Sequence, residues 1–269
     1  MISGRTSLLA IVGDPIAQAR APGLVNAALA ARGEDVVMVP VHVGRGELAG
    51  VIEGFRTIRN FRGTIVTMPH KEAIVPLLDT VTDEARLVGA CNVVRREGDG
   101  RLVGTMLDGE GFVAALRRAG HDVRGKRVFL AGAGGAAAAI AFAMGKYGAA
   151  ALTIHNRTRA RAEALAARIV AAWGTLATSV GDDRPAAHDL VINATSIGMQ
   201  AGDALPFDVT GLTPGTVVAE VVIRDEPTPL LAAAAARGCN VQPGRPMLAE
   251  QIELMIDFLI GTCGAHSSG

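Results

Sequence analysis

The sequence predicts the α/β fold class, and three observations lead to that prediction. Strand-like and helix-like segments alternate through the first hundred residues. An apolar run, a glycine cluster and an alanine-rich stretch follow one another from Val128 to Gly145. The 269 residues include 33 glycines and only 3% aromatic residues, which suits a protein of small aliphatic side chains and tight turns. This length lies within the usual range for two domains, so we expect two.

Apolar runs of strand length and helix-spaced apolar residues define the elements of the first part in order. Strands are expected at residues 7–13, 36–43, 63–68, 92–97 and 101–107, and helices at 22–33, 47–58 and 71–81. Gly33 is suited to end the first helix, and Gly98-Asp99-Gly100 is a turn between the last two strands. Asp108 is expected to cap the next helix.

The second part continues the alternation with shorter strands. Strands are expected at residues 127–130, 151–157, 189–195, 216–222 and 240–242, and helices at 109–120, 135–145, 161–173, 229–238 and 247–261.

The glycine cluster is the most informative stretch. Gly132, Gly134 and Gly135 supply backbone freedom for a tight turn. The following helix would then direct its free N–H groups and positive end at an anion such as a diphosphate. The strand at 151–157 completes a βαβ unit, so we expect a Rossmann-type dinucleotide-binding domain.

Two alternatives for this stretch carry no dinucleotide. Residues 128–145 contain no charge and approach the length of a membrane-spanning helix. Alanine and glycine contribute little transfer energy, however, and the glycines would break such a helix. The other alternative is a glycine turn that only packs a helix tightly on a sheet.

The end of the strand at 151–157 distinguishes between cofactors. An NAD site usually places an acidic residue about 20 residues after the glycine loop, whereas an NADP site places arginine nearby. Here the strand ends in Asn156, Arg157 and Thr158, and Arg161 follows one turn later. A guanidinium can bind a 2′-phosphate through two hydrogen bonds, although an arginine at a helix start is often only solvated. The sequence therefore favours NADP over NAD.

The charge balance and the cysteines argue against several kinds of binding partner and site. Lys+Arg and Asp+Glu both number 26, so no excess of positive charge favours nucleic acid or an anionic membrane as a partner. Cys91, Cys239 and Cys263 are odd in number and far apart, which argues against a disulfide framework or a zinc site. The apolar run at 7–13 is too brief for a signal peptide. We therefore expect a cytoplasmic protein without a bound metal.

A cluster of polar residues suited to catalysis follows the strand at 63–68. His70, Lys71 and Glu72 are expected to begin a helix at the carboxyl end of that strand, where open α/β sheets bind ligands. A lysine held near a hydroxyl can exchange a proton with it. The alternative is a surface lysine at a helix start.

Taken together, the motifs resemble those of the shikimate/quinate dehydrogenase family. The resemblance covers nearly the whole chain. It rests on GDPIAQARAP (13–22) with Asn26, VTMPHKE (66–72), GACN (89–92), LDGEGF (107–112), AGAGGAAAA (131–139), NRT (156–158), NATSIGM (193–199), TPLL (228–231) and GRPMLAEQ (244–251).

The resemblance implies a fold, a reaction and two domains. The expected domains are a substrate-binding catalytic domain over 1–107, completed by a C-terminal helix over 246–269, and an NADP-binding domain over 108–245. The cofactor cleft is expected between them. The implied activity is NADP-dependent oxidation of a ring hydroxyl in aromatic amino acid biosynthesis, by a monomer or homodimer. A non-catalytic NADP sensor on the same scaffold is the alternative.

The resemblance also implies roles for individual residues. Lys71 matches the general acid/base and Asp108 its partner, while Thr67, Asn92 and Gln251 match ligands of the substrate hydroxyls. The remaining matches are cofactor ligands: Gly132, Ala133, Gly134, Gly135 and Ala136 at the diphosphate, Asn156, Arg157, Thr158 and Arg161 at the 2′-phosphate, and Gly244 and Met247 beside the nicotinamide.

Several positions of the substrate pocket depart from the family pattern. Ala19 and Ala21 stand where members acting on shikimate usually have serines that hold the carboxylate. Ile65 replaces a usual asparagine, and Ile223 replaces a common tyrosine. The pair Met106-Leu107 replaces an Asn-Thr pair.

All of these changes are from polar to apolar, and each lost hydrogen bond costs roughly 0.5–1.5 kcal/mol. We therefore expect a substrate less polar at one end than shikimate. The alternative is that Arg20, Gln18 or shifted backbone still binds the carboxylate.

Overall fold

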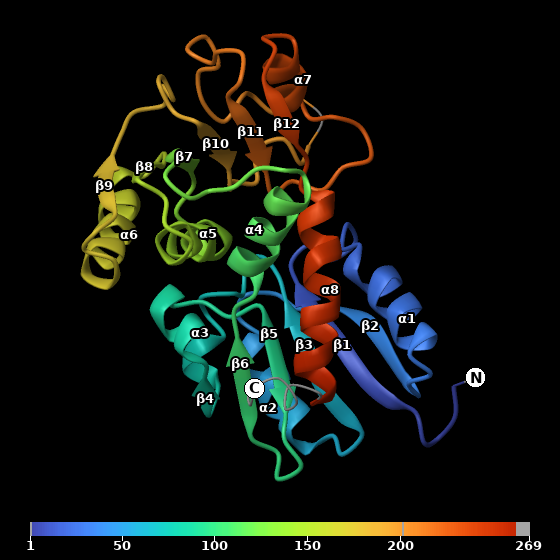
Figure 1. The fold of residues 1–269 in the computed structure, drawn as a ribbon. Helices are drawn as coiled ribbons and strands as arrows, with labels where there is room; N and C mark the ends of the chain where they lie inside the picture. Colours follow the sequence, from blue (N-terminus) through green and yellow to red (C-terminus); the bar gives the residue numbers. More distant parts are fainter. Residues whose placement is uncertain (1, 201, 262–269) are drawn as a thin grey trace, which may run out of the picture. The chain divides into compact units, whose positions relative to one another are not determined.

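The protein is described by a computed structural model that covers residues 2–200 and 202–261 (Figure 1). The chain divides into two compact units, one formed by Met1–Leu107 with Ala249–Gly269 and the other by Asp108–Leu248. Each unit contains its own six-stranded sheet. The α/β class expected from the sequence is confirmed.

The first unit holds a mixed sheet in the order β2-β1-β3-β5-β6-β4. Its strands are β1 (Ser7–Gly13), β2 (Val36–His42), β3 (Phe61–Val66), β4 (Thr80–Val81), β5 (Val93–Arg96) and β6 (Leu102–Thr105). Its helices are α1 (Ala21–Ala31), α2 (Leu48–Thr57), α3 (Asp83–Val88) and a 3-10 turn at Val75–Leu77. β1 runs parallel to β2 and β3, whereas β5 is antiparallel to both β3 and β6.

The last helix, α8 (Arg245–Ile260), lies against β3 toward its C-terminal end (Figure 1). Gly63 of β3 makes this approach possible, because a Cβ there would lie 2.6 Å from Leu259 Cδ2. Arg32, just after α1, donates a hydrogen bond to Asp257 at 2.7 Å. The C-terminal half of α8 therefore packs on the sheet of the first unit. Residues 262–269 of the helix expected over 246–269 lie outside the described residues.

The second unit holds a parallel sheet in the order β12-β11-β10-β7-β8-β9. Its strands are β7 (Arg127–Ala131), β8 (Ala151–His155), β9 (Ala177–Val180), β10 (Leu190–Asn193), β11 (Val217–Glu220) and β12 (Asn240–Gln242). Its helices are α4 (Asp108–Arg118), α5 (Gly135–Lys146), α6 (Arg159–Ala172) and α7 (Pro229–Ala235). The chain winds outward from β7 in one direction and returns to β10 in the other, which is the Rossmann order.

The helix expected over 71–81 is wrong. Only Val75–Leu77 form a short 3-10 turn there, and Thr80–Val81 form β4. Pro76 explains the difference, since it lacks an N–H and its ring clashes with the preceding turn of an α-helix. Lys71 accordingly lies in a series of turns after β3 and not at a helix start.

Smaller differences concern α3, β9 and Asp108. The sequence analysis did not predict α3, whose first turn is capped by the Thr82 hydroxyl accepting a hydrogen bond from Ala85 N. It also missed β9, a four-residue strand with no fully buried side chain. Asp108 is the first residue of α4 and not its cap.

The membrane-spanning alternative for 128–145 is wrong, because these residues divide into β7, a loop and α5. No helix among the described residues is long and apolar enough to cross a membrane. Cys91 and Cys239 are buried and belong to no disulfide, while Cys263 lies outside the described residues. Within residues 2–200 and 202–261, no cluster of His, Cys, Asp or Glu could hold a metal ion.

Candidate active site

The loop after β7 is a cradle built from backbone. Gly132 has φ of 121°, and a Cβ on it would lie 2.8 Å from the carbonyl oxygen of Ala194 after β10. Its N–H donates to His155 O at the end of β8 at 2.8 Å. Gly134 precedes α5 without a side-chain cap, and a Cβ there would meet no heavy atom within 4 Å. The loop thus leaves room for an anion at the N-terminus of α5, at the point where the strand order reverses.

The loop after β8 carries the basic residues expected at a 2′-phosphate. Asn156 Nδ2 donates to Thr158 O at 2.9 Å, which fixes the turn into α6. Arg157, Thr158 and Arg161 are all exposed. The structure therefore brings this loop to the carboxyl edge of the sheet beside the glycine loop, since Gly132 N bonds the last residue of β8. Ala133 and Ala136 lie in and after the glycine loop, each half-buried.

The turn after β3 holds Lys71 in the first unit. His70 is buried, and its Nε2 lies 2.6 Å from Val43 O; a carbonyl only accepts, so Nε2 carries the proton. Ile74 N donates to His70 O at 3.0 Å. Cys91 N donates to Lys71 O at 2.8 Å, which ties the turn to the segment before β5. The backbone at Lys71 is thus held on both sides while its side chain stays half-buried.

Asn92 joins this turn to the chain that leads into α4. Its backbone accepts from Val66 N at 2.8 Å and donates to Thr105 O at 3.0 Å. Its side-chain Oδ1 accepts from Leu107 N at 2.9 Å. Thr67 follows Val66 directly and is half-buried. Thr67, Lys71 and Asn92 therefore lie near the carboxyl end of β3.

Two further polar residues of the expected site are almost fully buried. Asp108 at the start of α4 and Gln251 in α8 are each 3% exposed. Burying such groups is costly unless they are hydrogen-bonded, and both have polar partners in the structure.

The apolar departures from the family pattern also have distinct environments. Ala21 and Ile65 are each 4% exposed, and Met106 is 3% exposed. Ala19, just before α1, and Ile223, after β11, are half-buried.

Gln18 and Arg20 are the two side chains that the sequence offers as ligands of a substrate carboxylate in place of the missing serines. Gln18 Nε2 already donates to Pro15 O at 2.8 Å, which commits one of its donors. Arg20 is exposed and also has a partner of its own.

Gly244 and Met247 lie at the start of α8, within the second unit. A Cβ on Gly244 would lie 2.5 Å from Val222 O, so only glycine fits against this backbone. Met247 is buried.

Glu220, a residue that the sequence analysis did not select, ends β11 with only 1% of its surface exposed. Burial raises the pKa of Glu220 to about 7, and hydrogen bonds from Thr228 and Asn193 oppose that rise. A signal was present in the sequence, since Glu220 is the only charged residue within the apolar run TVVAEVV.

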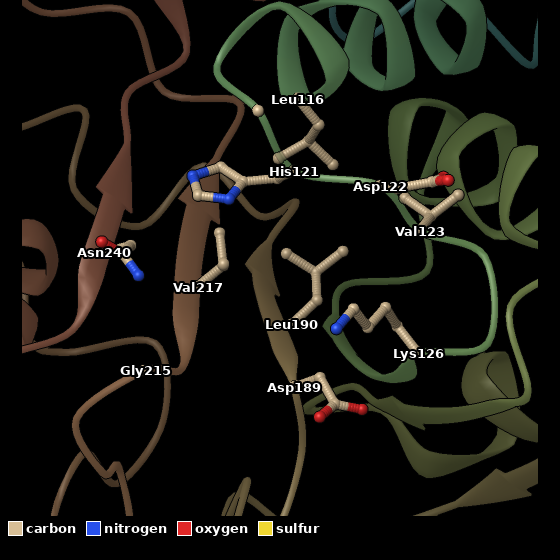
Figure 2. A pocket seen from close by; sticks show the side chains of 11 residues that line it. Leu116, His121, Asp122, Val123, Lys126, Asp189, Leu190, Gly215, Val217 and Asn240 are labelled. Atoms are coloured by element: carbon tan, nitrogen blue, oxygen red, sulfur yellow. The ribbon is translucent and has the colours of Figure 1, made fainter.

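A depression of about 380 Å³ lies at the opposite edge of the same sheet (Figure 2). Leu190, Val217 and Asn240, each the first residue of its strand, line it. Nucleotides bind at the carboxyl ends of parallel strands, whereas this hollow is at the amino ends. Its two carboxylates, on Asp122 and Asp189, already accept backbone hydrogen bonds. We therefore place no cofactor there.

Comparisons with known proteins give consistent matches. Residues 11–94 match the model of the shikimate dehydrogenase substrate binding domain, and residues 114–199 match that of shikimate / quinate 5-dehydrogenase. A protein from Rubrobacter xylanophilus named shikimate dehydrogenase (NADP(+)) is 41% identical over 254 residues, covering 93% of this chain and 89% of that protein.

Solved structures give the same result. The shikimate 5-dehydrogenase of Listeria monocytogenes, in complex with shikimate and NAD, is 34% identical with a TM-score of 0.86, covering 97% of this chain and 93% of that one. The 5-ketofructose reductase of Gluconobacter sp. strain CHM43 is also 34% identical, with a TM-score of 0.84 and coverage of 96% and 94%.

Proposed function

The chain belongs to the shikimate/quinate dehydrogenase family, and on that premise we propose that it oxidises shikimate reversibly to 3-dehydroshikimate with NADP. It is then an oxidoreductase acting on a CH–OH group, in aromatic amino acid biosynthesis. The observation that carries the proposal is the turn after β3, which holds Lys71 beside Asn92 and Thr67 through main-chain hydrogen bonds. A non-catalytic sensor is not favoured, because a relative 41% identical over 93% of the chain is named as the dehydrogenase.

The residues of the second unit fit NADP. The absence of side chains at Gly132 and Gly134 and the uncapped start of α5 suit a diphosphate. Arg157 and Arg161 supply the positive charge that a 2′-phosphate requires. When bound, NADP supplies the acceptor for the hydride that leaves the carbinol carbon, and returns it in the reverse direction.

Lys71 is assigned as the general base in the oxidation. Its Nζ accepts the proton of the reacting hydroxyl as the carbonyl forms, and it returns the proton when the ketone is reduced. Asp108 is assigned as the carboxylate that positions Lys71 and balances its charge. Thr67, Asn92 and Gln251 are assigned to the substrate hydroxyls, which orient the carbinol carbon.

A second candidate is a substrate without the carboxylate of shikimate. The specific observation for it is the pair Ala19 and Ala21, which has no hydroxyl to bind a carboxylate. The likeness to the 5-ketofructose reductase supports it, since a ketosugar carries no carboxylate. Loss of several hydrogen bonds to a charged group would lower turnover of shikimate by orders of magnitude.

A panel of alcohols tests both candidates. NADPH formation is measured with shikimate, quinate and cyclic alcohols that lack the carboxylate. In the reverse direction, NADPH consumption is measured with 5-ketofructose. Turnover of shikimate supports the main proposal, and turnover of the uncharged substrates alone supports the second. Tight NADP binding with no turnover of any substrate would contradict both.

The proposal also covers the location, oligomeric state, partners and domain bounds of the enzyme. We place it in the cytoplasm, as a monomer or homodimer, with a small hydroxy substrate and with neither nucleic acid nor membrane as a partner. The substrate domain is assigned to residues 1–107 with the C-terminal helix, and the NADP domain to residues 108–245.

A further inference from the structure

Glu220 is the centre of a buried polar cluster at the carboxyl edge of the nucleotide-binding sheet. Thr228 Oγ1, at the start of α7, donates to Glu220 Oε2 at 2.9 Å. The Asn193 side chain, at the end of β10, also stabilises the ionised form of the Glu220 carboxyl group. The carboxyl group therefore connects the segments that follow β10 and β11, two adjacent strands.

The partners of Glu220 are themselves fixed by further hydrogen bonds. Asn193 Nδ2 donates to Ile197 O at 3.0 Å, and Asn193 Oδ1 accepts from Thr195 N and Thr195 Oγ1 at 3.1 and 2.7 Å. Because Nδ2 donates to a carbonyl and Oδ1 accepts two hydrogen bonds, the orientation of the amide is determined. Thr228 Oγ1 also accepts from Leu231 N as the cap of α7.

The segment directly after Glu220 forms a ledge on which Gly244 lies. Val221 N donates to Asn193 O at 3.0 Å. A Cβ on Gly244 would lie 2.5 Å from Val222 O and 2.8 Å from Val221 O. The position of Gly244, assigned beside the nicotinamide, thus depends on the backbone that Glu220 anchors.

We propose that Glu220 is a positioning residue that holds the Val221–Val222 ledge, and with it the nicotinamide side of the NADP site, in the geometry required for hydride transfer. The proposal rests on the function proposed above, because it concerns the same NADP site. It predicts an effect on the nicotinamide half of the cofactor and none on the adenosine half, whose loops follow β7 and β8.

The charge state of Glu220 adds a pH dependence. Its partners from β10 and α7, Asn193 and Thr228, are neutral, and the residue that ends the neighbouring β12 is the neutral Gln242. Arg224, which donates to Gly198 O, is the charged group that acts on Glu220. The ionised carboxylate accepts from both donors, whereas the protonated form has one lone pair fewer. The ledge is therefore held more firmly as the pH rises through about 7.

The test compares binding of NADP with that of 2′-phospho-ADP-ribose, which lacks the nicotinamide and keeps the diphosphate. Calorimetry is run from pH 6 to pH 8 on the wild type, Glu220→Ala, Glu220→Gln, Thr228→Val and Glu226→Gln. Glu226 is an exposed glutamate in the same segment and is the matched control. Because both ligands carry the 2′-phosphate, its own titration cancels in the ratio of the two dissociation constants.

Glu220→Ala and Thr228→Val are expected to weaken NADP about five- to tenfold while changing 2′-phospho-ADP-ribose less than about twofold. In the wild type and Glu226→Gln, the affinity ratio should shift toward NADP through pH 7. Glu220→Gln should retain most of the NADP affinity and lose the shift.

Equal weakening of both ligands, unchanged NADP binding in Glu220→Ala and Thr228→Val, or a pH step that persists in Glu220→Gln would overturn the proposal. Failure of the wild type to oxidise any alcohol would contradict the proposed function instead, and the binding comparison would still decide the role of Glu220.

Discussion

The loop after β7 and the turn after β3 both follow parallel strands, but the first offers backbone groups to a ligand and the second offers side chains. The loop after β7 is backbone: Gly132 and Gly134 have no side chains, and the N-terminus of α5 provides the polarity. The turn after β3 is held by main-chain hydrogen bonds and by buried His70, and its polar groups are the side chains of Lys71 and Asn92. A backbone site recognises a feature shared by many ligands, whereas a side-chain site selects one reaction.

Substitutions in the two regions should therefore affect different properties of the protein. Changes in the turn should abolish chemistry and spare cofactor binding. A change at Gly132 should disturb folding as well as cofactor binding, because this residue packs against the segment after β10.

The largest effect is expected for Lys71→Ala. Turnover should fall by about 10²–10⁴, the usual contribution of a general acid/base. NADP affinity, measured by calorimetry, should stay within about twofold, since Lys71 is assigned to the substrate and not to the cofactor. Unchanged turnover would remove Lys71 from the mechanism, and a large loss of NADP affinity would erase the distinction between the two regions.

Gly132→Ala should destabilise the protein by roughly 2–4 kcal/mol, measured by chemical unfolding, because the residue combines a positive φ with a backbone clash. The clash is between the new Cβ and Ala194 O, at 2.8 Å. Gly134→Ala is the matched control for stability, with φ of −93° and no heavy atom within 4 Å of its Cβ. It should cost less than about 1 kcal/mol yet still weaken NADP. Equal stability losses in the two variants would contradict the packing role of Gly132.

The buried carboxyl of Glu220 should make stability depend on pH. Its pKa is raised from 4.5 to about 7 on folding, so the folded state binds the proton more tightly than the unfolded state. Its contribution is fully present below pH 4.5 and is lost as the pH rises through about 7, by up to about 3 kcal/mol. Unfolding curves from pH 5 to pH 8 should show this decline in the wild type and in Glu226→Gln, and a flatter one in Glu220→Gln. Parallel curves for all three proteins would refute the shifted pKa.

The smallest effect is expected for Arg157→Ala. Preference for NADP over NAD should fall about tenfold, the equivalent of one charge-assisted hydrogen bond. Arg124→Ala, an exposed arginine far along the chain, should leave the preference unchanged. Equal weakening of NADP and NAD in Arg157→Ala would reject the 2′-phosphate assignment.

The backbone region was the more predictable of the two from sequence. Glycine spacing, a preceding apolar run and a following strand are local signals, and they placed β7, α5 and β8 correctly. The turn after β3 was predicted as a helix because its apolar residues have helical spacing, and Pro76 overrides that spacing. Lys71 was selected by its place after a predicted strand, and Thr67 and Asn92 were selected by resemblance to a family; none was selected by a periodic pattern.

Glu220 shows a second limit of sequence patterns. A glutamate in an apolar run is visible in the sequence, but its partners Asn193 and Thr228 lie on other elements. Only the parallel pairing of β10 with β11 brings them together. β9 was not predicted because its four residues, two exposed and two half-buried, give too few apolar positions to form a pattern.

The most direct test of the proposed reaction follows the hydrogen that is transferred from shikimate to NADP. Shikimate that carries deuterium at the carbon of the reacting hydroxyl is incubated with NADP and the wild-type protein, and the reduced cofactor is examined by mass spectrometry. The deuterium is expected in the reduced cofactor with the wild type and should be barely detectable there with Lys71→Ala. Reduced cofactor without deuterium, or no reduced cofactor from the wild type, would contradict the assignment of this protein as a shikimate dehydrogenase.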